Sequence, residues 1–90
     1  MKINFNNIIN VYGNDVFLLI MENKEVVIKN IEYLNKLNFT DIENIFERYA
    51  ILFLVSPSEF KYKINNLIKE IGSDYIEIIE NDLSIFEKLL

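Results

Sequence analysis

The stretch "NFTDIENIFERYAILF" (residues 38–53) is followed one helix-length later by "IGSDYIEIIENDLSIF" (residues 71–86), and the two share one pattern. Aligning residues 30–53 with residues 63–86, at an offset of 33, gives seven identical positions in 24. The identical pairs are Ile31/Ile64, Leu34/Leu67, Lys36/Lys69, Asp41/Asp74, Ile45/Ile78, Glu47/Glu80 and Phe53/Phe86. Most apolar positions also match apolar positions, which favours an internal repeat.

A third copy of the pattern stands near the front of the chain. The segments "NDVFLL", "RYAILF" and "NDLSIF" begin at Asn14, Arg48 and Asn81, so the three copies are almost evenly spaced. A period of this length is typical of helical-repeat arrays, in which each unit packs on its neighbours. We therefore expect residues 1–90 to form one all-α domain of two to three units, each a short helix, an apolar corner and a long helix.

Local signals define the helices of these units. The segment "SPSE" from Ser56 is a capping box with Pro57 at the first helical position, and Gly72 suits the helix end, so we predict a helix over 57–71. Apolar spacing predicts another long helix over 24–37.

The shorter helices have weaker signals. We expect Thr40 and Ser73 to act as N-caps of two short helices, because both precede apolar residues at helical spacing. The segment "NNIINVYG" predicts a further short helix that ends at Gly13.

Three apolar runs leave a second fold open. The segments "DVFLLI", "YAILFLV" and "DYIEII" are short enough to be buried strands, because periodicity does not separate a strand from a buried helical turn at this length. Read as strands, they predict a small three-stranded α/β domain. The repeat favours the all-α interpretation.

The segment "NIEYLNKLNFTDIENIFERYAILFLVSPSEFKYKINNLIKEIG" resembles the repeat of the mitochondrial transcription termination factor (mTERF) family. The resemblance covers about residues 14–90, with Ala50 where the family's repeat has a proline after the basic residue. It implies a right-handed array of three-helix units, and often nucleic-acid binding along a basic groove. The positions in step with that repeat are Leu34, Leu37, Ile42, Ile45, Arg48, Leu52, Ser56, Glu59, Ile64 and Leu67.

Composition argues against catalysis. The chain has no Cys and no His, which excludes thiolate nucleophiles, zinc fingers and histidine acid–base chemistry. It also lacks a Gly-rich phosphate loop, and the paired carboxylates of Glu43 and Glu47 are typical of a solvated helix face. We expect no enzymatic activity, no metal and no cofactor.

Charge and hydropathy limit the kinds of partner that this chain is expected to bind. The net charge is −5, and residues 73–90 hold one Lys against five acids, which is −4 of that total and repels phosphate. The first residues lack the apolar core of a signal peptide, and no apolar run approaches the roughly 20 residues of a membrane span. We expect a cytoplasmic protein without a membrane partner.

Two functions remain from these observations. The first is a non-catalytic protein-interaction module that binds a protein partner or a second copy, because short repeat arrays expose apolar surface at their ends. The alternative is nucleic-acid binding through the lysines of the long helices, which the acidic charge disfavours. Its candidate residues are Lys29, Lys36, Arg48, Lys63 and Lys69. In "KYK" (61–63), Tyr62 stands between two lysines, whereas most other aromatic residues fall at core-like positions: Phe17, Phe46, Phe53, Phe60, Tyr75 and Phe86.

Overall fold

The computed structural model describes residues 5–90 of the chain and is all-helical over that range. Because the described range contains no strand, the all-α interpretation is confirmed and the three-stranded α/β alternative is wrong. The α-helices are α1 (Phe5–Tyr12), α2 (Asn14–Glu22), α3 (Lys24–Lys36), α4 (Ile42–Arg48), α5 (Pro57–Ile71) and α6 (Tyr75–Asn81). The 3₁₀ helices are η1 (Ala50–Leu54) and η2 (Leu83–Leu89).

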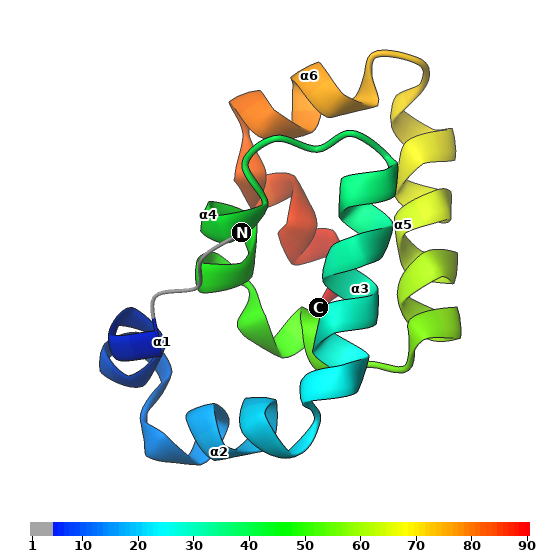
Figure 1. Cartoon of the computed structure of the whole chain (residues 1–90). Coiled ribbons are helices and arrows are strands. Elements are labelled where there is room, and N and C mark those ends of the chain that lie inside the picture. The colour runs from blue at the N-terminus through cyan, green and yellow to red at the C-terminus, as the bar shows by residue number, and fades with distance from the viewer. Residues whose placement is uncertain (1–4) are drawn as a thin grey trace.

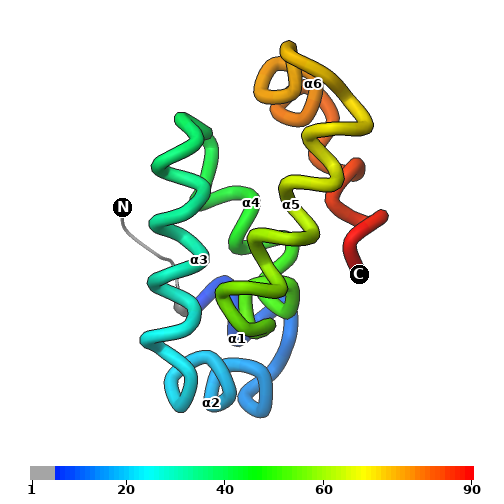
Figure 2. Tube along the Cα trace, turned by 90° about the vertical axis from the view of Figure 1, so that its right-hand side faces the viewer, coloured from blue at the N-terminus to red at the C-terminus, as the bar shows by residue number. Residues whose placement is uncertain are grey.

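The two long helices pack against each other. Helices α3 and α5 lie side by side and run in the same direction, as Figure 1 shows. Helix α2 lies at one end of the molecule and α6 at the opposite end in both views (Figures 1 and 2). The extents of 37 × 25 × 22 Å make the molecule longer in one direction than in the others.

The order long helix, short helix, 3₁₀ helix occurs twice. The first residues of the matching elements are Lys24 and Pro57, Ile42 and Tyr75, and Ala50 and Leu83, and all three pairs have the offset of the sequence alignment. The segment "NDVFLL" instead lies in the α-helix α2, so the N-terminal helices do not follow this order. The boundaries of the elements therefore agree with the sequence repeat, and a right-handed array of such units remains a prediction.

Helix α5 has the boundaries that its sequence predicts. The Ser56 hydroxyl accepts a hydrogen bond from the Glu59 backbone N–H at 3.3 Å, and Pro57 fills the first position. Gly72 follows with a φ of +104°, a conformation that glycine adopts without a Cβ clash. Helix α3 likewise ends at Lys36, one residue before the predicted limit, and α1 is followed by Gly13 as expected.

The predicted caps of the short helices are wrong by one residue. Asp41 and Asp74, not Thr40 and Ser73, are the N-cap residues of α4 and α6. Thr40 uses its polar groups elsewhere: its backbone N–H and its hydroxyl donate to the two carboxylate oxygens of Glu80, each at 2.7 Å. A contact between residues 40 positions apart thus replaces the local cap.

Aromatic side chains join the two halves of the core. The rings of Phe46 and Phe60 each lie 5.2 Å from the ring of Phe53, centroid to centroid. Phe86 of η2 lies 6.3 Å from Phe39 and packs against the first half of the molecule. Of the aromatic residues predicted to be in the core, Phe46, Phe53, Phe60 and Phe86 are fully buried, whereas Phe17 and Tyr75 are half-buried.

Two polar side chains fix the chain around η1. Asn30 is 1% exposed, and its amide nitrogen donates to the carbonyl oxygens of Phe53 and Val55, both at 2.9 Å. The Tyr12 hydroxyl donates to the carbonyl of Arg48 and accepts the backbone N–H of Ala50 at 3.3 Å. These bonds satisfy backbone groups at the junction between α4 and η1 and at the end of η1.

Candidate functional site

A lysine groove runs between α3 and α5. We define it by its lining residues: Lys29, Glu32, Tyr33, Lys36, Pro57 and Lys61. Its volume is about 230 Å³. The α3 residues of the groove fall at helical spacing on one face, and the start of α5 supplies the opposite wall. Three ammonium groups face one carboxylate here, so the groove is locally cationic on a chain of net charge −5.

Tyr33 is held in place by three contacts. Its ring meets Phe60 edge-to-face at 6.4 Å, and its hydroxyl donates to Asn65 Oδ1 at 2.5 Å. The Lys61 ammonium lies 5.5 Å from the centroid of the same ring, within the range of a cation–π contact. A base that stacks on this face of the ring first has to displace Lys61.

The five cations predicted from the sequence do not form one surface. Lys29 and Lys36 share the groove, and the sequence analysis missed Lys61 as their neighbour, although it singled out the "KYK" segment. The Lys63 ammonium donates to the carbonyl of Leu89 at 3.0 Å, so it holds the end of η2.

Arg48 and Lys69 lie away from the groove. The Arg48 guanidinium lies 5.4 Å from the ring centroid of Tyr49, beside a pocket that also includes Glu47 and Glu87. Lys69 is exposed in the last turn of α5, where a cation interacts favourably with the helix dipole. Neither lines the lysine groove.

Helix α2 exposes large apolar side chains at one end of the molecule. Leu18 is 55% exposed, Leu19 is 46% exposed and Met21 is 42% exposed, whereas Ile20 is the buried residue of this helix. Leu18 and Met21 are one turn apart and therefore neighbours on its surface. The exposed acids Asp15 and Glu22 lie on the same helix.

Helix α6 presents a different surface at the other end. We define the outer face of α6 by its exposed residues at helical spacing, which are Asp74, Glu77, Ile78 and Asn81. Ile78 is 42% exposed, whereas Ile45, its aligned residue in the preceding copy of the repeat, is fully buried. The outer face of α6 is thus acidic around one uncovered aliphatic side chain.

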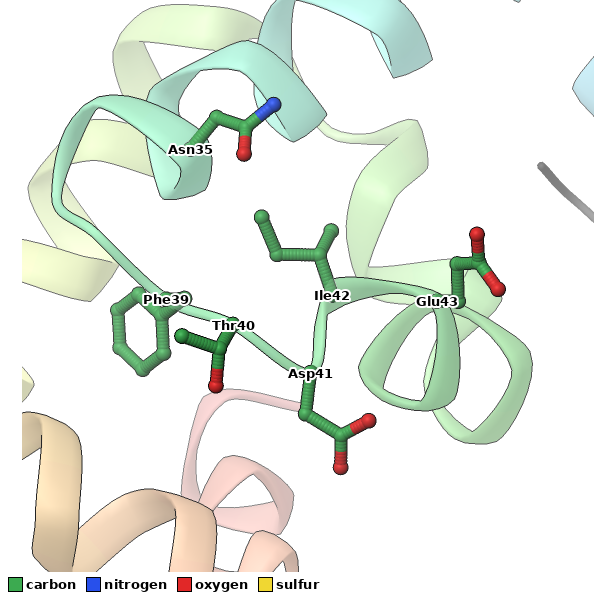
Figure 3. Close-up of a pocket in the computed structure, with 6 residues that line it drawn as sticks. All are labelled: Asn35, Phe39, Thr40, Asp41, Ile42 and Glu43. Carbon is green, nitrogen blue, oxygen red and sulfur yellow. The ribbon is translucent and has the colours of Figure 1, made fainter. Parts of the chain in front are cut away.

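A wider pocket of about 380 Å³ lies where the chain enters α4 (Figure 3). It is lined by Asn35, Phe39, Thr40, Asp41, Ile42 and Glu43. Figure 3 shows the carboxylates of Asp41 and Glu43 pointing in different directions. Asp41 also accepts a hydrogen bond from the Asn44 amide at 3.3 Å. The two acids therefore do not converge on a point between them, as a pair acting on one substrate must.

Tyr49 has a shifted pKa. Burial of its ring raises the pKa of the phenol above the usual value of 10.0. Arg48 opposes this shift, while the carboxylates of Glu87 and Asp82 add to it. Because the ring packs against Phe86 at 5.9 Å, the shift reflects the core of the molecule.

Between residues 5 and 90, no three acidic side chains gather in an arrangement that could hold a metal ion. Over the same residues, no helix combines the length and the apolarity that crossing a bilayer requires.

Comparison with known proteins gives no relative. No protein-family model matches the chain, and neither a curated protein nor a solved structure matches it.

Proposed function

We propose that this chain is a non-catalytic protein-interaction module that binds a protein partner through the exposed face of α2. The supporting observation is the uncovered apolar surface of Leu18, Leu19 and Met21 at one end of the molecule. Contiguous apolar side chains at a surface are typical of protein contact sites. As part of this proposal, the module is a cytoplasmic, mTERF-like helical-repeat protein.

The composition of this face indicates the kind of partner. Asp15 and Glu22 accompany the apolar side chains on α2, so a complementary surface combines an apolar hollow with cationic residues around it. Met21 has a flexible, unbranched side chain, which adapts to irregular partner surfaces. Helix α2 packs against α1, α3 and η1, so we expect it to dock as part of one rigid surface.

A capture experiment with matched variants tests this proposal. The double variant Leu18→Gln/Met21→Gln removes the apolar contact and keeps good helix formers. Tyr62→Gln is the control, because Tyr62 is 68% exposed on α5, away from α2. We expect a protein retained by the wild type and by the control to be lost from the double variant. Capture that is equal on all three chains would contradict the proposal.

Nucleic-acid binding is the second candidate function. It is supported by the convergence of Lys29 and Lys36 with Lys61 in one groove. It is weakened by the separate positions of Arg48 and Lys63 and by the net charge of −5. A fluorescence-anisotropy titration with duplex DNA tests it, because phosphate contacts weaken steeply between about 50 mM and 200 mM salt.

A further inference from the structure

We propose that copies of this chain associate with one another by docking the outer face of α6 of one copy into the lysine groove of another. This inference uses surfaces other than the α2 face and stands independently of the proposed partner. It rests on the charge, the exposure and the shape of two surfaces, both within the described residues.

The groove has cations without acidic partners in the described part of the chain. Within residues 5–90, the ion pair that forms joins Lys88 to Glu70 at 3.3 Å, and neither Lys29 nor Lys36 takes part in one. Both lysines are exposed, and Glu32 is the one carboxylate that lines the groove beside them. An acidic surface that docks here gains attraction without breaking an existing ion pair.

The outer face of α6 has the opposite charge. Asp74 and Glu77 are exposed and also make no ion pair within residues 5–90. Residues 73–90 hold −4 of the net charge of −5, and Asp74 and Glu77 belong to this acidic segment. The two surfaces are therefore complementary in sign.

Shape and exposure point to the same contact. Ile78 lies beside the acids of the outer face of α6 and is 42% exposed, although the aligned Ile45 is fully buried. The groove is about 230 Å³ in volume, and Tyr33 and Pro57 line it together with the lysines. One branched aliphatic side chain fits a hollow of this size, and the neighbouring acids Asp74 and Glu77 are then close to the lysines that line it.

Other occupants fit the groove less well. The α2 face also combines acids with apolar side chains, but Lys24 follows closely after it in the chain and reduces its negative charge. A nucleic acid needs a track of phosphate contacts, whereas three lysines gather here and Lys63 is bound to a carbonyl. The repulsion between two copies of net charge −5 is screened beyond about 8 Å at physiological ionic strength. The local charge complementarity of the two surfaces therefore determines whether the copies associate.

Sedimentation velocity over a range of protein concentrations tests this contact. We expect the weight-average mass of the wild type to rise with concentration. The mass should fall when salt is raised from about 0.1 M to about 1 M, which shortens the Debye length from about 10 Å to about 3 Å. The groove variant Lys29→Glu/Lys36→Glu and the α6 variant Asp74→Asn/Glu77→Lys should each weaken association by about tenfold or more.

Matched controls separate this contact from net charge. Lys24→Glu/Lys69→Glu changes the charge as much as the groove variant but lies outside the groove. Asp15→Asn/Glu22→Lys changes it as much as the α6 variant but lies on α2. Both controls should associate like the wild type, and circular dichroism should confirm that every variant folds.

Mixing provides the decisive result. The α6 variant keeps an intact groove and the groove variant keeps an intact α6, so a mixture of the two should form a complex that neither forms alone. A wild type that stays monomeric, or a mixture that stays monomeric, overturns the proposal. A monomeric wild type whose groove binds duplex DNA, with binding lost in the groove variant, assigns the groove to nucleic acid and overturns it as well.

Discussion

Asn30 and Lys63 occupy aligned positions of the two long helices, and each donates to a main-chain carbonyl at the end of the 3₁₀ helix that follows. The Asn30 amide bonds Phe53 and Val55 at 2.9 Å, and the Lys63 ammonium bonds Leu89 at 3.0 Å. Different side chains thus perform one task at equivalent positions. Asn30 is buried and Lys63 is half-buried, so removal of the two side chains should lower stability by different amounts.

Asn30→Ala should lower the free energy of unfolding by about 2–4 kcal/mol, because the buried carbonyl of Phe53 and the partly buried carbonyl of Val55 lose their donor. Lys63→Ala should lower it by about 1 kcal/mol or less, since water reaches the freed carbonyl. Urea unfolding followed by circular dichroism measures both. Equal losses of stability for the two variants would contradict the argument from the unequal burial of their hydrogen bonds.

Glu80→Ala should lower the free energy of unfolding by about 1–2 kcal/mol, because the backbone N–H and the hydroxyl of Thr40 both lose their acceptor. Glu77→Ala is the control on the same helix, since Glu77 is exposed, and we expect a change below about 0.5 kcal/mol. Chemical unfolding of both variants provides the comparison. A Glu80→Ala variant as stable as its control would show that Thr40 is satisfied by water instead.

Stability should fall in alkaline solution through the titration of Tyr49. Its pKa is raised in the folded state, so between the unfolded-state value near 10.0 and the higher folded-state value the folded chain binds more protons. The contribution of Tyr49 is present in full below pH 10 and is lost as the pH rises through the folded-state pKa. Thermal unfolding at pH 8 and above pH 10 should show a smaller loss for Tyr49→Phe than for the wild type.

Ser56→Ala should cost about 1 kcal/mol of stability through loss of the N-cap of α5. Ser73→Ala is the matched control, because Asp74 rather than Ser73 occupies the N-cap of α6, and we expect little change. Urea unfolding compares the two variants with the wild type. Measured losses of similar size for both variants would show that Ser73 caps α6 after all.

The sequence predicts the long helices well because their signals are local. Ser56, Pro57 and Gly72 define α5 through the chemistry of its ends, and the observed boundaries agree with these local signals. The predicted cap at Thr40 fails because Thr40 bonds to Glu80, a residue that folding alone brings near. The run "YAILFLV" remains ambiguous in the sequence, and packing makes most of it a 3₁₀ helix with Leu52 and Phe53 buried.

The candidate site is less predictable than the fold. Helical spacing places Lys29 and Lys36 on one face of α3. Nothing local indicates that Lys61 joins them across the groove or that Lys63 turns to the carbonyl of Leu89. The sequence does not predict the exposure of Ile78 either, since its sequence neighbourhood matches that of the buried Ile45. These properties depend on which elements lie beside each helix.

The bonds of Tyr12 also determine how the chain opens. Its hydroxyl links α1 to the backbone of Arg48 and Ala50, so detachment of α1 breaks hydrogen bonds at the α4–η1 junction. Amide protons of α1 and of that junction should therefore exchange with solvent in one cooperative unit. Tyr12→Phe should divide this unit, so that α1 exchanges by local fraying while the junction still requires a larger unfolding event.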